Sequence, residues 1–159
     1  MKSLFFLCLL FPALLAQNAN SCLIKQDLFE GYIFDKDYQL VFIFPGQKDR
    51  IELQDNDIIK AEQILRAKIK IINRFKPNQA DGSVPVIDQS LGKYTRQYVG
   101  YTNKKGERIV WINCIWANID ERELPVNVVR RFNGCSYFWN VKVNLTTKEL
   151  FDLDVDFCG

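Results

Sequence analysis

SYFWNVKVNL at residues 136–145 and LFDLDVDF at residues 150–157 alternate apolar and polar side chains around the polar turn TTKE. Apart from Phe138 and Leu150, the apolar side chains of both runs occupy odd positions: Tyr137, Trp139, Val141, Val143, Leu145, Phe151, Leu153, Val155 and Phe157. Alternation with a period of two is typical of antiparallel strands that bury one face and expose the other. The pattern predicts a hairpin in which Lys142 lies near Asp154.

The second run also raises the question of a metal site, because Asp152, Asp154 and Asp156 follow one another at every second position. Calcium loops need ligands that converge around a sharp turn, whereas alternating strand residues stand in a row about 7 Å apart. We therefore expect no metal at these aspartates, and no motif in the chain predicts another cofactor.

A second hairpin and one helix precede this region. Residues 94–101 and 107–117 are rich in β-branched and aromatic residues and flank the polar turn TNKKG. Upstream, the possible N-cap residues 55–57 begin a segment that ends before Pro77 and has apolar residues at helical spacing: Ile58, Ala61, Ile64, Leu65, Ile69 and Ile72. Residues 38–44 (YQLVFIF) predict one more strand. The sequence thus predicts an α+β fold in which one amphipathic helix packs on an antiparallel sheet of about four to five strands, a cystatin-like arrangement.

The amino terminus has the pattern of a secretory signal peptide: Lys2, an apolar run over residues 4–15 and the small residue Ala16. This run is shorter than the about 20 apolar residues that span a membrane. We expect residues 1–16 to be removed, and residues 17–159 to form a single domain in the periplasm or outside the cell. Cys22 follows small residues, as in bacterial lipoprotein signals, but a polar spacer at 17–20 favours soluble export over lipidation.

Charge and composition limit the function classes. The chain has a formal net charge of +2 and no histidine. A nearly neutral protein has no general attraction for nucleic acid or an anionic membrane surface, so we expect neither as a partner. Nucleophilic catalysis by cysteine usually needs an activating histidine. A carboxylate-based hydrolase stays as an alternative, with Asp120, Glu121 and Glu123 as candidates, although such clusters are ordinarily solvated surface.

Four cysteines follow the expected signal peptide, and an even number in an exported chain favours disulfides. Cys135 continues the odd-numbered face of the last hairpin and Cys158 its even-numbered face, so a bridge between them would require a bulge. Cys114 shares a face with Ile112 and Trp116 and meets Cys135 if their strands are neighbours. We therefore predict a Cys114–Cys135 disulfide, with a buried free Cys114 as the main alternative.

Aromatic residues concentrate in the predicted strands, and residues 107–117 are apolar on both faces. Such a segment is either a central strand covered on both sides or a surface that meets another molecule. If a partner surface exists, the expected residues are Tyr98, Tyr101 and Trp111. The oligomeric state is left open.

The segments KYTRQYVGY (93–101), VWINC (110–114) and FWNVKVNLTTK (138–148) resemble a group of small exported proteins of Bacteroidota-type bacteria. The resemblance implies a bacterial envelope location and brings no known mechanism. Cys135 and Cys158 depart from the pattern of that group.

We predict an exported, non-enzymatic envelope or secreted protein that binds a partner, either a protein or another envelope component. The alternatives are the hydrolase and a cystatin-like protease inhibitor. Cystatins insert a Gln-x-Val-x-Gly hairpin into proteases, and this chain carries QYVG at residues 97–100, with the glycine one position early. A shift of one residue reverses the faces of a strand, which argues against inhibition.

Overall fold

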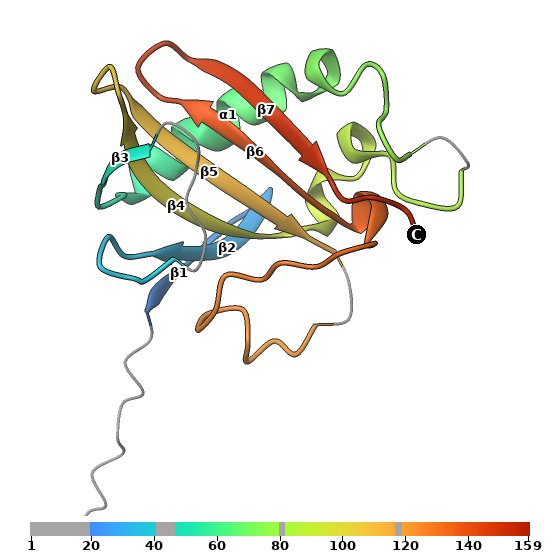
Figure 1. Cartoon of the computed structure of the whole chain (residues 1–159), viewed down its shortest axis with the longest axis horizontal. Helices are drawn as coiled ribbons and strands as arrows, with labels where there is room; N and C mark the ends of the chain where they lie inside the picture. The colour runs from blue at the N-terminus through green and yellow to red at the C-terminus, as the bar shows by residue number, and fades with distance from the viewer. Residues whose placement is uncertain (1–19, 41–46, 80–81, 117–118) are drawn as a thin grey trace, which may run out of the picture.

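The computed structural model describes residues 20–40, 47–79, 82–116 and 119–159, and the expected signal peptide lies outside them. Within the described residues, one α-helix lies across one face of a seven-stranded sheet (Figure 1). The elements are β1 (Ser21–Gln26), β2 (Phe29–Phe34), β3 (Gln47–Arg50), α1 (Asp55–Ile72), β4 (Thr95–Asn103), β5 (Arg108–Ile115), β6 (Phe138–Asn144) and β7 (Glu149–Val155). The predicted α+β class with a single helix is confirmed.

The strand order is β1-β2-β4-β5-β6-β7, and β3 pairs with the second half of β4. All pairs are antiparallel except β2 with β4, which run parallel. The sheet has more strands than predicted, and the cystatin-like arrangement is not confirmed. The strand expected at residues 38–44 is not found at residues 38–40, and its remainder lies outside the described residues.

Helix α1 buries the predicted apolar stripe against the sheet. Ile58, Ala61, Leu65 and Ile69 are buried in one core cluster with side chains from β4, β5 and β6. At the start of the helix, the Asp57 carboxylate accepts a hydrogen bond from the Gln54 backbone N–H (3.1 Å), which satisfies a donor near the helix terminus. Among the described residues, no helix is long and apolar enough to cross a membrane.

The opposite face of the sheet is covered in part by the segment 119–133, which two buried amides hold in place. The Gln97 side chain donates to the carbonyls of Leu124 (2.9 Å) and Asn127 (2.7 Å) and accepts from the Val129 N–H (2.8 Å). Asn113 donates to the Val129 carbonyl (2.7 Å). Because both faces of β4 and β5 are covered, these strands form the centre of the molecule.

The last hairpin contains a bulge that the alternating pattern does not indicate. Asp152 has a positive φ of 51°, and the register changes so that Phe151 pairs with Lys142. Phe151 therefore packs on the face opposite the helix, away from Val155. The predicted pairing of Lys142 with Asp154 is wrong, because Lys142 contacts Asp152 (2.8 Å) and Asp154 accepts a hydrogen bond from Asn140 (3.1 Å).

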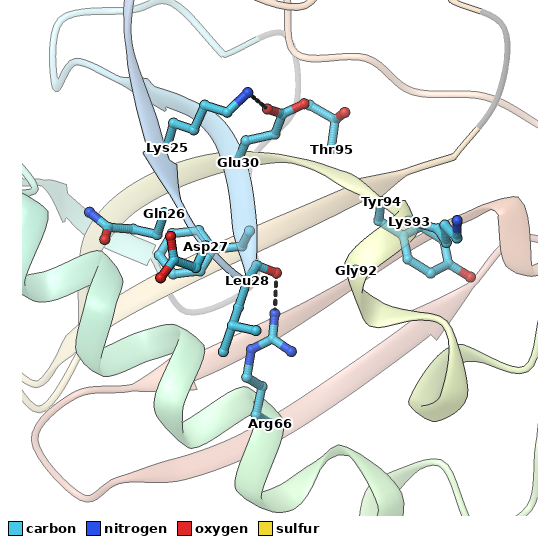
Figure 2. A pocket seen from close by; sticks show the side chains of 11 residues that line it. Lys25, Gln26, Asp27, Leu28, Glu30, Arg66, Gly92, Lys93, Tyr94 and Thr95 are labelled. Carbon is cyan, nitrogen blue, oxygen red and sulfur yellow. Dashed lines mark hydrogen bonds and ion pairs between the residues drawn. The ribbon is translucent and has the colours of Figure 1, made fainter.

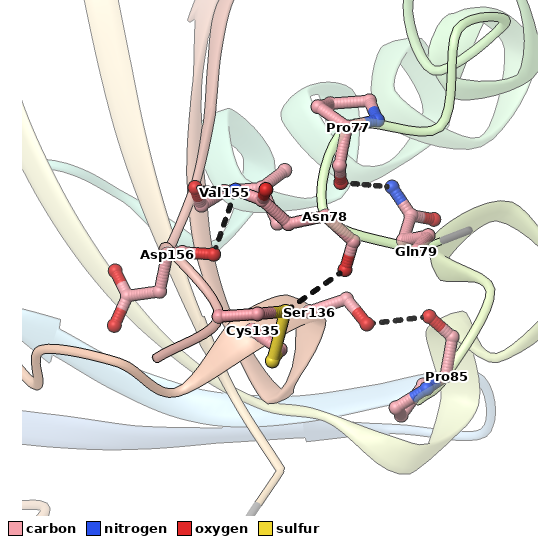
Figure 3. Close-up of a disulfide and its surroundings, with 9 residues drawn as sticks. Pro77, Asn78, Gln79, Pro85, Cys135, Ser136, Val155 and Asp156 are labelled. Atoms are coloured by element: carbon pink, nitrogen blue, oxygen red, sulfur yellow. Dashed lines mark hydrogen bonds between the residues drawn. A yellow bond between two sulfur atoms is a disulfide. The ribbon is translucent and has the colours of Figure 1, made fainter. Parts of the chain in front are cut away.

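The disulfide joins Cys135 to Cys158 (Figure 3). Cys114 is a buried free thiol. The predicted Cys114–Cys135 bridge is therefore wrong. Cys135 lies in a short 3-10 turn (Cys135–Tyr137) with a positive φ of 48°, so it does not continue the strand face assigned to it. Its backbone N–H donates to the Phe157 carbonyl (3.2 Å), which brings it beside Cys158.

Removing this disulfide with Cys158→Ser is expected to lower the free energy of unfolding by about 2–4 kcal/mol, because the bridge closes a loop and restricts the unfolded chain. The two cysteines are separated by 23 residues. Urea unfolding measures the change, and Cys22→Ser is the control because Cys22 is exposed and unpaired. Equal midpoints for the two variants, or recovery of a Cys114–Cys135 peptide under non-reducing conditions, would contradict this pairing.

Candidate functional site

The residues predicted as a partner surface lie in the interior. Tyr98, Tyr101 and Trp111 are 0%, 2% and 1% exposed, respectively. The Tyr98 hydroxyl donates to the Glu62 carboxylate (3.0 Å), and the Trp111 indole N–H donates to Asn140 (2.9 Å). The prediction of a surface at these three residues is wrong, because β4 and β5 are central strands covered on both faces.

The residues proposed for the two alternative functions are also placed by the fold. Residues 97–100 lie in the middle of β4 and are fully or largely buried, so this segment cannot enter a protease as an inhibitory hairpin. Asp120 lies in the segment that covers the sheet and is paired with Arg122 (2.7 Å). Hydrogen bonds from the Arg122 side chain and backbone lower the pKa of Asp120, whereas a general acid needs a raised pKa.

Strand β1 forms one edge of the sheet, and four of its six residues are exposed. It pairs with β2 along its full length without a register shift, and no strand in the described residues lies on its other side. The Asp35 N–H donates to the Asn20 carbonyl (3.2 Å), so residues of even number direct their backbone groups toward β2. Ser21, Leu23 and Lys25 therefore direct their N–H and C=O groups outward.

The other edges of the sheet are protected. At the opposite end of the strand order, β7 is interrupted by the bulge at Asp152 and carries the acidic residues Glu149, Asp152 and Asp154. Strand β3 has four residues and a register shift between Gln47 and Arg50. Bulges, charges and short length are the usual means by which proteins prevent strand addition at an edge. β1 has none of these except Lys25, which forms an ion pair with Glu30 on β2 (3.0 Å).

The turn of the β1–β2 hairpin is fixed to helix α1 by Arg66. Its guanidinium donates to the Leu28 carbonyl (2.5 Å), as Figure 2 shows. On β2, a Cβ at Gly31 would lie 2.4 Å from the Arg96 carbonyl oxygen, so glycine permits the close approach of β2 to β4. At the start of β1, the Ser21 hydroxyl donates to the Pro125 carbonyl (2.7 Å). The edge strand is therefore held at both ends and along its inner side.

Cavities border both ends of this strand. At the hairpin turn, one of about 330 Å³ is lined by Lys25, Arg66 and Tyr94, among others. A second, of about 260 Å³, lies between the turn and the helix and is lined by Leu28, Phe29 and Ile59, among others. The cavity at the other end has about 350 Å³, with Cys22, Ile33 and Leu53 in its lining. Leu23 and Leu28 are 57% and 62% exposed, so apolar side chains accompany the outward-directed backbone groups.

Behind the hairpin turn lies a buried charge cluster that supports Arg66. The Glu62 carboxylate accepts from Arg96 (3.0 Å) and Tyr98 (3.0 Å), and its second oxygen lies 3.8 Å from the Arg66 guanidinium. Burial raises the pKa of the Tyr98 hydroxyl, and the nearby Glu62 carboxylate raises it further. Burial also raises the pKa of the Cys114 thiol. A protonated, enclosed thiol is unsuited to nucleophilic attack, so this cluster has the character of a structural support.

The sequence interpretation missed this hairpin, of which only the spacing is visible in the sequence. SCLIKQ at residues 21–26 and FEGYIF at residues 29–34 are separated by two residues, the spacing of a tight hairpin. Comparison of the chain with protein-family models, curated proteins and solved structures finds no match.

Proposed function

We propose that this chain is an exported, non-enzymatic binding protein that takes up an extended polypeptide segment as an additional strand beside β1. The contrast between the edges of the sheet carries the proposal. β7 and β3 have bulges or charges that oppose strand addition, whereas β1 is regular and anchored. Main-chain hydrogen bonds supply affinity in this mode of recognition, and pockets for alternate side chains supply selectivity.

The side chains of an added strand would alternate between two environments. Ile24 is buried on the helix face of β1, so a partner side chain on that face lies toward the cavities bordered by Ile59 and Leu53. Leu23 stands on the opposite face and is exposed. Apolar side chains at alternate positions of the partner therefore fit both faces. Because the hairpin is already held by Arg66 and Ser21, little additional ordering is needed on binding.

Export remains part of the proposal. The Asn20 carbonyl accepts from Asp35 and the Ser21 hydroxyl donates to Pro125, so both residues contribute contacts to the fold. Lipidation at Cys22 would require their removal, and retaining these contacts favours soluble export. The Cys135–Cys158 disulfide is also consistent with an oxidising compartment. The resemblance to small envelope proteins of Bacteroidota-type bacteria fits the same location.

Leu23→Pro is expected to weaken strand addition by about tenfold or more. Proline removes the outward N–H, and a partner carbonyl left without its donor costs about 1–3 kcal/mol. A random peptide library selected on the immobilised protein supplies the ligand, and fluorescence polarisation with a synthetic copy of an enriched peptide measures the affinity. The Leu23 N–H does not contribute to the pairing with β2, so the variant is expected to keep its fold by circular dichroism.

Leu23→Thr is the matched control, because it shortens the apolar side chain and keeps the N–H. It should retain most of the affinity that Leu23→Pro loses. Enriched peptides that bind Leu23→Pro as tightly as the wild-type protein would place the binding surface elsewhere. A selection on monomeric protein that yields no peptide binder would also argue against the proposed function.

A further inference from the structure

We infer that the segment taken up by β1 is the β1 strand of a second copy, so that two copies pair edge to edge in an antiparallel, two-fold arrangement centred on Leu23. This inference rests on the proposed function, because it names the polypeptide that fills the free edge. Three observations support it: the direction of the backbone groups, the exposure of Leu23 and the position of the charges.

The backbone groups of β1 are self-complementary in one register. Only Ser21, Leu23 and Lys25 direct their N–H and C=O groups outward. With Leu23 facing the partner's Leu23, Ser21 of each copy faces Lys25 of the other, and every outward residue is in a hydrogen-bonded pair. Centring the pair on Cys22 or Ile24 instead leaves one outward residue of each strand opposite a residue beyond β1. The register centred on Leu23 therefore satisfies the most backbone groups.

The side chains suit the same register. Leu23, 57% exposed in the single chain, would contact its own copy across the two-fold axis and lose water-accessible apolar surface. Lys25 would face the partner's Ser21, so no like charges stand directly opposite each other. Lys25 also keeps its ion pair with Glu30 (3.0 Å) on its own hairpin. On the helix face, Cys22 would lie opposite the partner's Ile24, which is an apolar contact.

The free thiol gives this arrangement a measurable signature. Within the described residues Cys22 is exposed, Cys114 is buried, and Cys135 is bonded to Cys158. Across the two-fold axis the two Cys22 residues are diagonal neighbours on the same face, about 7–8 Å apart. This separation is at or beyond the limit of about 7 Å for a disulfide. A short bismaleimide, in contrast, spans the two thiols.

The test uses the purified full chain carrying Cys8→Ser, which removes the thiol in the expected signal peptide. Light scattering should give twice the chain mass of 18.6 kDa at about 100 µM, where a Kd of about 10 µM leaves the protein mostly dimeric. A short bismaleimide should cross-link the two copies through Cys22. Cys22→Ser should abolish the cross-link and leave the dimer mass unchanged.

Charge substitution at the axis distinguishes a second copy from any other occupant. Leu23→Lys and Leu23→Glu each place two like charges face to face, so each variant alone should be monomeric. An equimolar mixture should recover the dimer, because lysine then faces glutamate. Circular dichroism confirms that each variant is folded, since Leu23 is an exposed residue.

The outcomes separate this inference from the proposed function. A wild-type monomer that still binds selected peptides at β1 overturns the inference and leaves the proposed function standing. A monomer that binds no peptide overturns both. A dimer that persists in Leu23→Lys alone uses another surface and overturns the inference. Recovery of the dimer only in the charge-matched mixture supports it.

Discussion

Glu62→Gln is expected to lower the free energy of unfolding by about 3–5 kcal/mol, because it removes one partner of a buried ion pair. The side chains of Glu62 and Arg96 are 2% and 0% exposed, and their closest atoms are 3.0 Å apart. Glutamine is nearly isosteric but neutral, so the Arg96 guanidinium would stay in the interior without its counter-charge. Urea unfolding monitored by tryptophan fluorescence measures the loss.

Glu121→Gln is the control for this substitution. Glu121 is exposed in the segment that covers the sheet, and such surface changes usually alter stability by less than about 0.5 kcal/mol. A double variant, Glu62→Leu with Arg96→Met, removes both charges and should be more stable than Glu62→Gln. Similar midpoints for Glu62→Gln and Glu121→Gln would mean that the buried pair contributes little to stability.

The helix and the two long hairpins could be predicted from the sequence because their patterns are local. The apolar stripe of α1 has helical spacing, and TNKKG and TTKE separate runs of strand-like residues. Within each hairpin the two strands also pair directly with each other, β4 with β5 and β6 with β7. For such elements, turn residues and the period of the apolar pattern are sufficient to predict the secondary structure.

The β1–β2 hairpin and its place in the sheet could not be predicted in the same way. Cys22, Leu23 and Ile24 are consecutive apolar residues, so β1 lacks a clear alternation, and its turn contains no glycine. The parallel pairing of β2 with β4 also joins segments that are separated by α1. Such a crossover is common around a helix, but the strand patterns alone are equally compatible with a simple meander.

The candidate site depends on long-range contacts that no sequence pattern indicates. Tyr98 and Trp111 looked available because β4 and β5 are apolar on both faces. Their burial comes from α1 on one face and, on the other, from a cover that includes the polar segment 119–133, held by Gln97 and Asn113. In the last hairpin, alternation alone predicted the wrong pairing of β6 with β7. The bulge at Asp152, which has a positive φ, shifts the register of the two strands. The position of β1 at an edge of the sheet also depends on how all the strands assemble, so no local sequence pattern indicates it.

Leu65→Ala is expected to lower the free energy of unfolding by about 2–5 kcal/mol, the usual range for truncating a buried leucine. Leu65 lies in the middle of α1, is 0% exposed and packs in the cluster between helix and sheet. Lys70→Ala is the matched control, because Lys70 is exposed on the same helix and alanine retains helix propensity. Urea midpoints compare the two variants. Truncating Leu65 removes buried packing contacts, whereas truncating the exposed Lys70 removes none. Equal stability of the two variants would therefore mean that the apolar stripe of α1 does not stabilise the core.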